Sequence, residues 1–120
     1  MSALAKLSAV VLDCVDPAAL AAFYQQATGW EVAYSDDDFV TLADGGPVQL
    51  SFQRVVGYQA PDWPDDRKHA HVDLTVADLE QAAKELIAAG AARPEFQPGE
   101  GGWLVLTDPA GHPLCLTTGG

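Results

Sequence analysis

The side chains best suited to chemistry alternate along one short segment of the chain. His69, His71 and Asp73 occupy every second position from residue 69 onward, and the residues between them are apolar. Because the side chains of a β-strand point alternately to its two faces, this spacing places both imidazoles and the carboxylate on one face. Imidazole and carboxylate groups can transfer protons or ligate a divalent metal ion. The polar face of this strand is therefore the first candidate for a functional site.

The elements that would position such a face begin in the first half of the chain. Asp16 is suited to cap a helix, Pro17 to start it, and Gly29 to end it with a left-handed residue. Apolar residues between Pro17 and Gly29 recur with helical spacing, and turn residues divide the segment that follows into short strands. The first half is therefore predicted to have the order βαβββ. The expected elements are a strand at 7–14, a helix at 17–28, and strands at 30–35, 39–43 and 48–54.

The second half repeats this order at a distance of about sixty residues, which is typical of an internal duplication. Asp78 is the expected cap of a second helix, and Gly90 is its expected end. Residues 55–68, rich in proline, glycine and aspartate, are predicted to connect a first module at about 7–54 to a second at about 69–118. The expected elements of the second module are a strand at 69–76, a helix from 79 to Gly90, and strands at 91–96, 102–107 and 112–118.

Length and charge limit the possible functions. With 120 residues, the chain is expected to form a single domain at 1–120, so the repeats must share a core or pair across a dimer. Its net charge of −11, with only six Lys and Arg residues, argues against binding to nucleic acid or to an anionic membrane surface. The acidic residues serve either solubility or the attraction of a cationic ligand. With no long apolar run, the protein is expected to be cytoplasmic, with Cys14 and Cys115 as thiols.

Three sets of residues resemble the vicinal oxygen chelate superfamily, and in particular its glyoxalase-like and bleomycin-resistance-like domains. They are Val11 to Pro17 with Phe23-Tyr24 and Gly29-Trp30, His71 to Val76 with Asp78-Leu79, and Asp108 to Pro113. The resemblance implies an α+β fold in which tandem βαβββ modules form a curved mixed sheet around a cavity, with helices on the convex side. This is the glyoxalase/bleomycin-resistance/dioxygenase fold. We expect a homodimer that binds a small-molecule ligand, with the modules paired either within the chain or across the dimer. Members include metal-dependent enzymes and inert drug-binding proteins, so the fold leaves the activity open.

Metal-dependent members of this superfamily place one ligand on the first and last strand of each module. The equivalent positions in this sequence are Ala9, Ser51, His71 and Cys115. Ala9 has no ligand atom, Ser51 is a poor neutral donor, and a cysteine replaces the carboxylate expected at the last position. A two-residue shift of register would bring Gln49 or Gln53 to the second position without supplying the missing first ligand. We therefore expect no metal cofactor; the alternative is a divalent ion held by His71 and Cys115 with His69 or Asp73.

The predicted function is the binding of a small apolar or aromatic ligand in the cavity, as in drug-sequestering proteins, without an intact family metal site. The alternative is a metal-dependent lyase or isomerase of the glyoxalase type, or a dioxygenase. His71 is the candidate catalytic residue, as a general base; otherwise it is a histidine of the cavity wall. Tyr58 and Trp63 in the connector are predicted to form a lid or a subunit contact. The expected ligand-binding residues are Val11, Asp13, Ser51, Gln53, Tyr58, Trp63, His71, Asp73 and Cys115.

Overall fold

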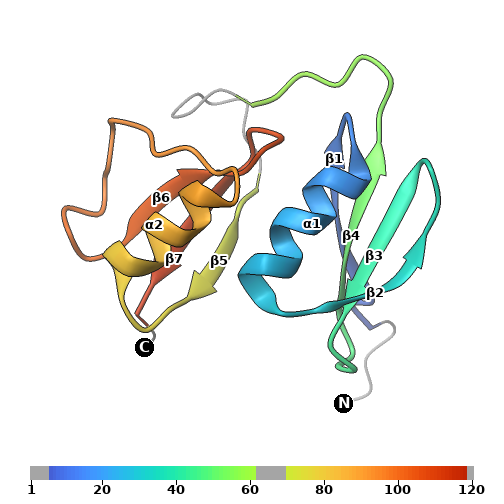
Figure 1. The fold of residues 1–120 in the computed structure, drawn as a ribbon, viewed down its shortest axis with the longest axis horizontal. Helices are drawn as coiled ribbons and strands as arrows, with labels where there is room; N and C mark the ends of the chain where they lie inside the picture. The colour runs from blue at the N-terminus through green and yellow to red at the C-terminus, as the bar shows by residue number, and fades with distance from the viewer. Residues whose placement is uncertain (1–5, 62–69, 119–120) are drawn as a thin grey trace. The chain divides into compact units, whose positions relative to one another are not determined.

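The chain folds into two compact units, each with one helix laid across a β-sheet (Figure 1). The computed structural model describes residues 6–61 and 70–118. Unit 1 is Met1–Tyr58 and unit 2 is Gln59–Gly120, so the division falls within the predicted connector. The α+β fold class with a repeated strand, helix and strands is confirmed. His69 and Trp63 lie outside the described residues.

Unit 1 contains the complete βαβββ order that the sequence predicts. Its elements are β1 (Ala9–Cys14), α1 (Pro17–Thr28), β2 (Glu31–Ser35), β3 (Phe39–Ala43) and β4 (Gln49–Arg54). The strands lie in the order β1-β4-β3-β2; β1 is parallel to β4, and the other neighbours are antiparallel. The first and last strands of the unit are therefore side by side.

Helix α1 begins and ends at the predicted residues. The Asp16 carboxylate accepts a hydrogen bond of 3.1 Å from the backbone N–H of Ala19, and Pro17 occupies the first turn. At the other end Gly29 has a φ of 74°, and its N–H donates to the carbonyl of Gln25. A residue with a Cβ would be strained at this φ, so glycine lets the chain turn directly into β2.

Aromatic packing decides which face of the unit 1 sheet is covered. The ring of Tyr24 on α1 stacks on Phe52 of β4 with centroids 5.4 Å apart, and Phe23 meets Tyr24 edge to face. Tyr24 and Phe52 are both fully buried. Because strand side chains alternate, the neighbours of Phe52 in β4 point to the opposite face of the sheet. Among the described residues of unit 1, no helix packs on that face.

Unit 2 is a shorter version of the same arrangement. Its elements are β5 (Val72–Thr75), α2 (Leu79–Ala88), β6 (Leu104–Thr107) and β7 (Pro113–Thr117). The strands lie in the order β5-β7-β6, with β5 parallel to β7 and β6 antiparallel to it. Asp78 caps α2 by accepting a hydrogen bond of 3.0 Å from the N–H of Gln81, as predicted. Among the described residues, no helix is long and apolar enough to span a bilayer.

The strand predicted at 91–96 is wrong as an element and survives as a single bridge between Ala92 and Thr107. The side-chain amide of Gln97 replaces it at the edge of β6. Its oxygen accepts from the N–H of Val105 at 2.9 Å, and its nitrogen donates to the carbonyls of Val105 and Pro94 at 2.8 and 2.9 Å. Pro94 has no N–H for a strand ladder. One side chain therefore satisfies the backbone groups that another strand would otherwise pair.

This role of Gln97 gives a stability prediction. Gln97→Ala removes three hydrogen bonds and leaves the backbone N–H and C=O of Val105, whose residue is fully buried, without this partner. The expected loss of unfolding free energy is about 2 kcal/mol, measured by urea denaturation. Gln26→Ala, on an exposed position of α1, is the matched control and should change stability little. Equal effects of the two substitutions would contradict the assignment.

Candidate functional site

The register of the strands defines a row of side chains on the helix-free face of unit 1. Phe52, under α1, aligns with Leu12 of β1 and Val40 of β3, so these residues share the covered face. Residues at the alternate positions share the opposite face. On that face Val11 of β1 is aligned with Ser51 of β4, Ser51 with Thr41 of β3, and Thr41 with Tyr34 of β2. The resulting set, which we call the unit 1 row, is Val11, Ser51, Thr41 and Tyr34.

The unit 1 row has a buried polar centre and exposed apolar ends. Ser51 Oγ and Thr41 Oγ1 are 2.9 Å apart and hydrogen-bonded, and the two residues are only 2% and 6% exposed. Val11 is 44% exposed and Tyr34 is 53% exposed. The hydroxyls therefore satisfy each other, while an aliphatic and an aromatic side chain on the same face remain open to solvent.

Tyr34 reaches this face through an irregularity in the hairpin. The register between β2 and β3 shifts between Val32 and Tyr34, so Tyr34 aligns with Thr41. A regular hairpin that continued from the pair Val32 and Leu42 would place Tyr34 opposite Val40, on the helix-covered face. The bulge thus brings an aromatic ring to the helix-free face, and no local pattern in the sequence predicts this placement.

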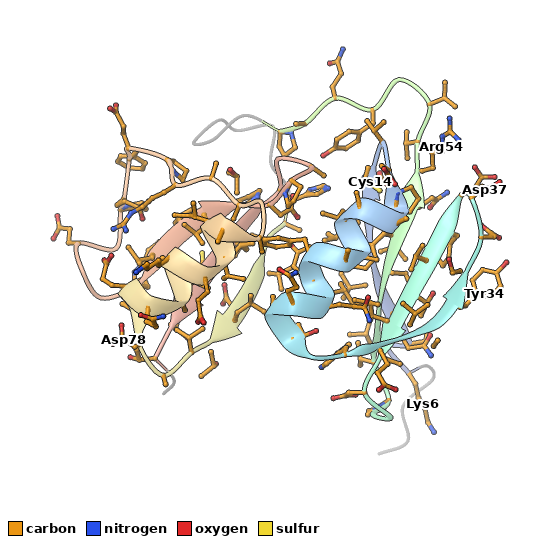
Figure 2. The ribbon with its side chains drawn as sticks, in the orientation of Figure 1. Lys6, Cys14, Tyr34, Asp37, Arg54 and Asp78 are labelled. Carbon is orange, nitrogen blue, oxygen red and sulfur yellow. The ribbon has the colours of Figure 1, made fainter. Side chains whose placement is uncertain are left out.

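A hydrogen bond holds the Tyr34 side chain at the edge of unit 1, where Figure 2 labels it. The phenol donates to Asp36 Oδ2 at 2.5 Å, and Asp36 Oδ1 accepts from the backbone N–H groups of Asp38 and Phe39. The phenol, followed by the Asp38 N–H, lowers the pKa of the Asp36 carboxyl. The same carboxylate raises the pKa of Tyr34, mainly by accepting its hydrogen bond. Both groups keep their ordinary charge at neutral pH, and the tyrosine stays a neutral donor.

One face of the unit 2 sheet carries ionisable groups. Asp73 on β5 aligns with Cys115 on β7, and His71 lies one residue before β5. His71 Nε2 is 3.2 Å from Asp73 Oδ1. One ligand atom from each of the three residues lies within 4.8 Å of the other two. We call this set (His71, Asp73 and Cys115) the unit 2 cluster. The structure thus brings together three of the site residues that the sequence predicts.

The four positions equivalent to the superfamily's metal ligands do not fit that centre. In unit 1, Ala9 offers no ligand atom, and the Ser51 hydroxyl is buried in its pair with Thr41. In the sheet Ala9 aligns with Gln49 and Val11 with Ser51, just as Asp73 aligns with Cys115 in unit 2. Of these four positions, His71 and Cys115 in unit 2 are the ones with imidazole or thiol ligand atoms. The superfamily's four-ligand metal centre therefore has no support from unit 1.

The remaining predicted site residues belong to neither the unit 1 row nor the unit 2 cluster. Asp13 and Gln53 are aligned partners on β1 and β4, and both are exposed. Tyr58 is partly buried at the end of unit 1, where its N–H donates to the carbonyl of Val55. Its role as a lid stays a prediction, as does that of Trp63, which lies outside the described residues. Cys14 and Cys115 are both thiols without a disulfide, as predicted.

Comparison with known proteins agrees with this architecture. A family model described as a glyoxalase-like domain matches residues 9–117. The chain belongs to this glyoxalase-like family. The family is part of the vicinal oxygen chelate superfamily, as the sequence resemblance implied. A search of curated proteins finds no match.

Solved structures share the fold of this glyoxalase-like protein at low sequence identity. A glyoxalase-related enzyme from Fulvimarina pelagi has a TM-score of 0.66 at 22% identity, covering 94% of this chain and 87% of its own. A glyoxalase/bleomycin resistance protein/dioxygenase family enzyme from Burkholderia phytofirmans has a TM-score of 0.70 at 20% identity, covering 93% and 97%. The bleomycin-binding protein of Streptomyces verticillus, complexed with copper(II)-bleomycin, has a TM-score of 0.60 at 22% identity, covering 99% and 100%. At these identities the likeness establishes the fold alone.

The hydroxyl pair of the unit 1 row can be tested by a double-mutant cycle. Ser51→Ala and Thr41→Val should each lower stability by about 1–2 kcal/mol, because each leaves one buried hydroxyl without its partner. The double variant should lose less than the sum, with a coupling energy of about 1 kcal/mol from urea denaturation. Strictly additive losses would mean that the two hydroxyls do not satisfy each other.

The Tyr34 hydrogen bond predicts a shift in titration. Tyr34→Phe should raise the pKa of the Asp36 carboxyl towards its ordinary value, because the carboxylate loses the phenol donor. A lowered pKa in the folded state adds stability above the unfolded value, and this is lost as pH falls through the folded value. The variant should therefore lose less stability on acidification. The measurement is an NMR titration of the Asp36 carboxyl carbon, and Tyr58→Phe, the matched control, should leave that titration unchanged.

Proposed function

We propose that this glyoxalase-like protein binds a small apolar or aromatic molecule on its helix-free surface and acts by sequestering it. The observation that carries the proposal is the unit 1 row. Val11 and Tyr34 expose apolar surface on the face that α1 leaves uncovered, and the hydroxyls between them are satisfied internally. Exposed apolar side chains on one face gain free energy when a ligand covers them. An aromatic ring at one end also favours stacking with an aromatic ligand.

The charge of the protein narrows the ligand class. A net charge of −11 disfavours anionic ligands and favours neutral or cationic ones. Asp13 lies two residues beyond Val11 on β1 and shares its face, so a carboxylate adjoins the apolar part of the row. A ligand with a flat apolar body and a positive or neutral polar group would match this surface.

A protein of the same fold supports a binding role. The Streptomyces verticillus structure is that of a bleomycin-binding protein holding copper(II)-bleomycin, and its fold covers this chain almost completely. A protein with this fold can therefore have ligand binding as its described role. In the present chain, the exposed Val11 and Tyr34 support the same role independently of that protein.

An enzyme is the second candidate function, and the pair of His71 and Asp73 favours it. A carboxylate 3.2 Å from Nε2 can orient an imidazole for service as a general base at its other nitrogen. The reaction class would be that of a lyase, isomerase or dioxygenase, for which the superfamily uses a metal to polarise substrate oxygens. Ala9 and the engaged Ser51 do not supply the unit 1 half of that centre. We therefore favour ligand binding.

The chain offers a matched pair of variants for testing the binding proposal. Val11 and Val10 are adjacent on β1 and almost equally exposed, at 44% and 42%. They point to opposite faces, because Val10 aligns with Leu50 on the side of α1 and Val11 aligns with Ser51. The probe is a neutral aromatic dye, N-phenyl-1-naphthylamine, followed by fluorescence with metal-free protein. Val11→Asn should weaken its binding by about tenfold, which corresponds to the loss of an apolar contact.

The control variants distinguish the two faces of β1, and they distinguish the aromatic ring of Tyr34 from its hydroxyl. Val10→Asn should leave dye binding unchanged, Tyr34→Ala should weaken it by about tenfold, and Tyr34→Phe should preserve it because the ring remains. Equal losses for Val10→Asn and Val11→Asn would overturn the assignment of the binding face. Absence of saturable dye binding by the unsubstituted protein would overturn the proposal itself.

A further inference from the structure

We propose that His71, Asp73 and Cys115 together bind one zinc ion, in a three-ligand centre contained entirely within unit 2. This goes beyond the proposed binding function, which depends on the unit 1 row and on no metal. The centre also differs from the four-ligand arrangement of the superfamily, because two of its ligands come from the β5 segment and one from β7 of the same unit.

Strand pairing brings the three side chains to one point. Asp73 and Cys115 are aligned partners in the parallel pair β5 and β7, so their side chains lie next to each other on one face. His71 lies one residue before β5, and its side chain contacts that of Asp73. Its longer side chain reaches back to the carboxylate, as the 3.2 Å separation between Nε2 and Oδ1 shows. Two alternate residues of one segment thus converge on the residue across from them.

The separations suit a tetrahedral ion. Ligand atoms about 2.0–2.1 Å from zinc lie roughly 3.3 Å apart at the corners of a tetrahedron, and a sulfur lies roughly 3.5 Å from the others. The distance of 3.2 Å between His71 and Asp73 already matches the first value. All three ligand atoms lie within 4.8 Å of one another, so the thiol needs to approach by no more than roughly 1.3 Å to reach the second value. Rotation about side-chain bonds supplies such a movement without rebuilding the strands.

The chemistry of the donor set selects zinc over harder cations. Thiolate and imidazole suit borderline and soft ions, whereas magnesium and calcium prefer oxygen ligands. With zinc bound, one carboxylate and one thiolate balance the charge of the ion, and the imidazole is neutral. Three protein ligands leave one coordination position open, which is typical of zinc that binds water or an exogenous donor. The exposed side chains of His71 and Asp73 (46% and 65%) leave that position accessible from solvent.

The test uses the full chain, purified under reducing conditions and stripped of metal. Cobalt(II) is the spectroscopic probe, because a thiolate ligand produces an intense near-ultraviolet charge-transfer band and tetrahedral geometry produces visible bands. We expect one cobalt ion per chain, displaced by zinc, and calorimetry should give the same stoichiometry for zinc itself. Cys115→Ser should abolish the near-ultraviolet band. His71→Gln and Asp73→Asn, at exposed positions, should each weaken zinc binding by on the order of tenfold or more.

Matched controls replace the same residue types elsewhere in the chain. Cys14→Ser, His112→Gln and Asp37→Asn change a thiol, an imidazole and a carboxylate outside the unit 2 cluster, and should retain the band and the affinity. Circular dichroism checks that each variant is folded. The proposal is overturned if the chain binds no cobalt or zinc, if the band persists in Cys115→Ser, or if His71→Gln and Asp73→Asn bind zinc as tightly as the unsubstituted chain. Loss of dye binding by metal-free protein would leave this result untouched, so the two proposals fail separately.

Discussion

The parallel pairing of the first strand with the last strand in each unit is the constraint on which the rest of the structure depends. In unit 1 it joins β1 to β4, and in unit 2 it joins β5 to β7. Side chains aligned across such a pair share a face. The pairing therefore determines that Val11 lies beside Ser51, and that Asp73 lies beside Cys115. Residues about forty positions apart in the sequence become neighbours only through this register.

The helices convert that register into two distinct surfaces. In unit 1 the helix buries the apolar residues of one sheet face, where Tyr24 stacks on Phe52. The residues between them must then occupy the other face, whatever their chemistry. The duplication thus produced equivalent surfaces with different contents. Unit 1 presents aliphatic, hydroxyl and aromatic groups, and unit 2 presents an imidazole, a carboxylate and a thiol.

This difference between the units explains why family membership alone does not establish the activity. The glyoxalase-like fold offers the same positions in both units, but the metal chemistry of the superfamily needs ligands from both. Unit 1 does not supply its ligands, because Ala9 has no ligand atom and the Ser51 hydroxyl is hydrogen-bonded to Thr41. The ionisable groups of unit 2 are held close together by strands of their own unit, so any chemistry they perform does not require the first half of the superfamily's metal centre.

Local chemical signals in the sequence were sufficient for most of the elements. The carboxylates of Asp16 and Asp78 cap the first turns of α1 and α2, and Gly29, which has no side chain, ends α1. These predicted roles are confirmed. Alternation of apolar and polar residues also identified which face would carry His71 and Asp73. Such signals depend on only a few neighbouring residues, so they can be recognised in the sequence. The strand expected at 91–96 was wrong because the competing partner of β6 is the side chain of Gln97, which no backbone periodicity reveals.

The contents of the candidate sites depended on contacts that only the tertiary structure decides. The sequence by itself determined the fold class, the two faces of each sheet and the lack of a ligand at Ala9. It could not determine that Ser51 pairs with Thr41, because that contact follows from the alignment of β3 with β4. Nor could it place Tyr34, since a single bulge moves every later residue of a strand to the other face. The convergence of Asp73 and Cys115 likewise required strand pairing, because residues far apart in the chain meet only when the sheet forms.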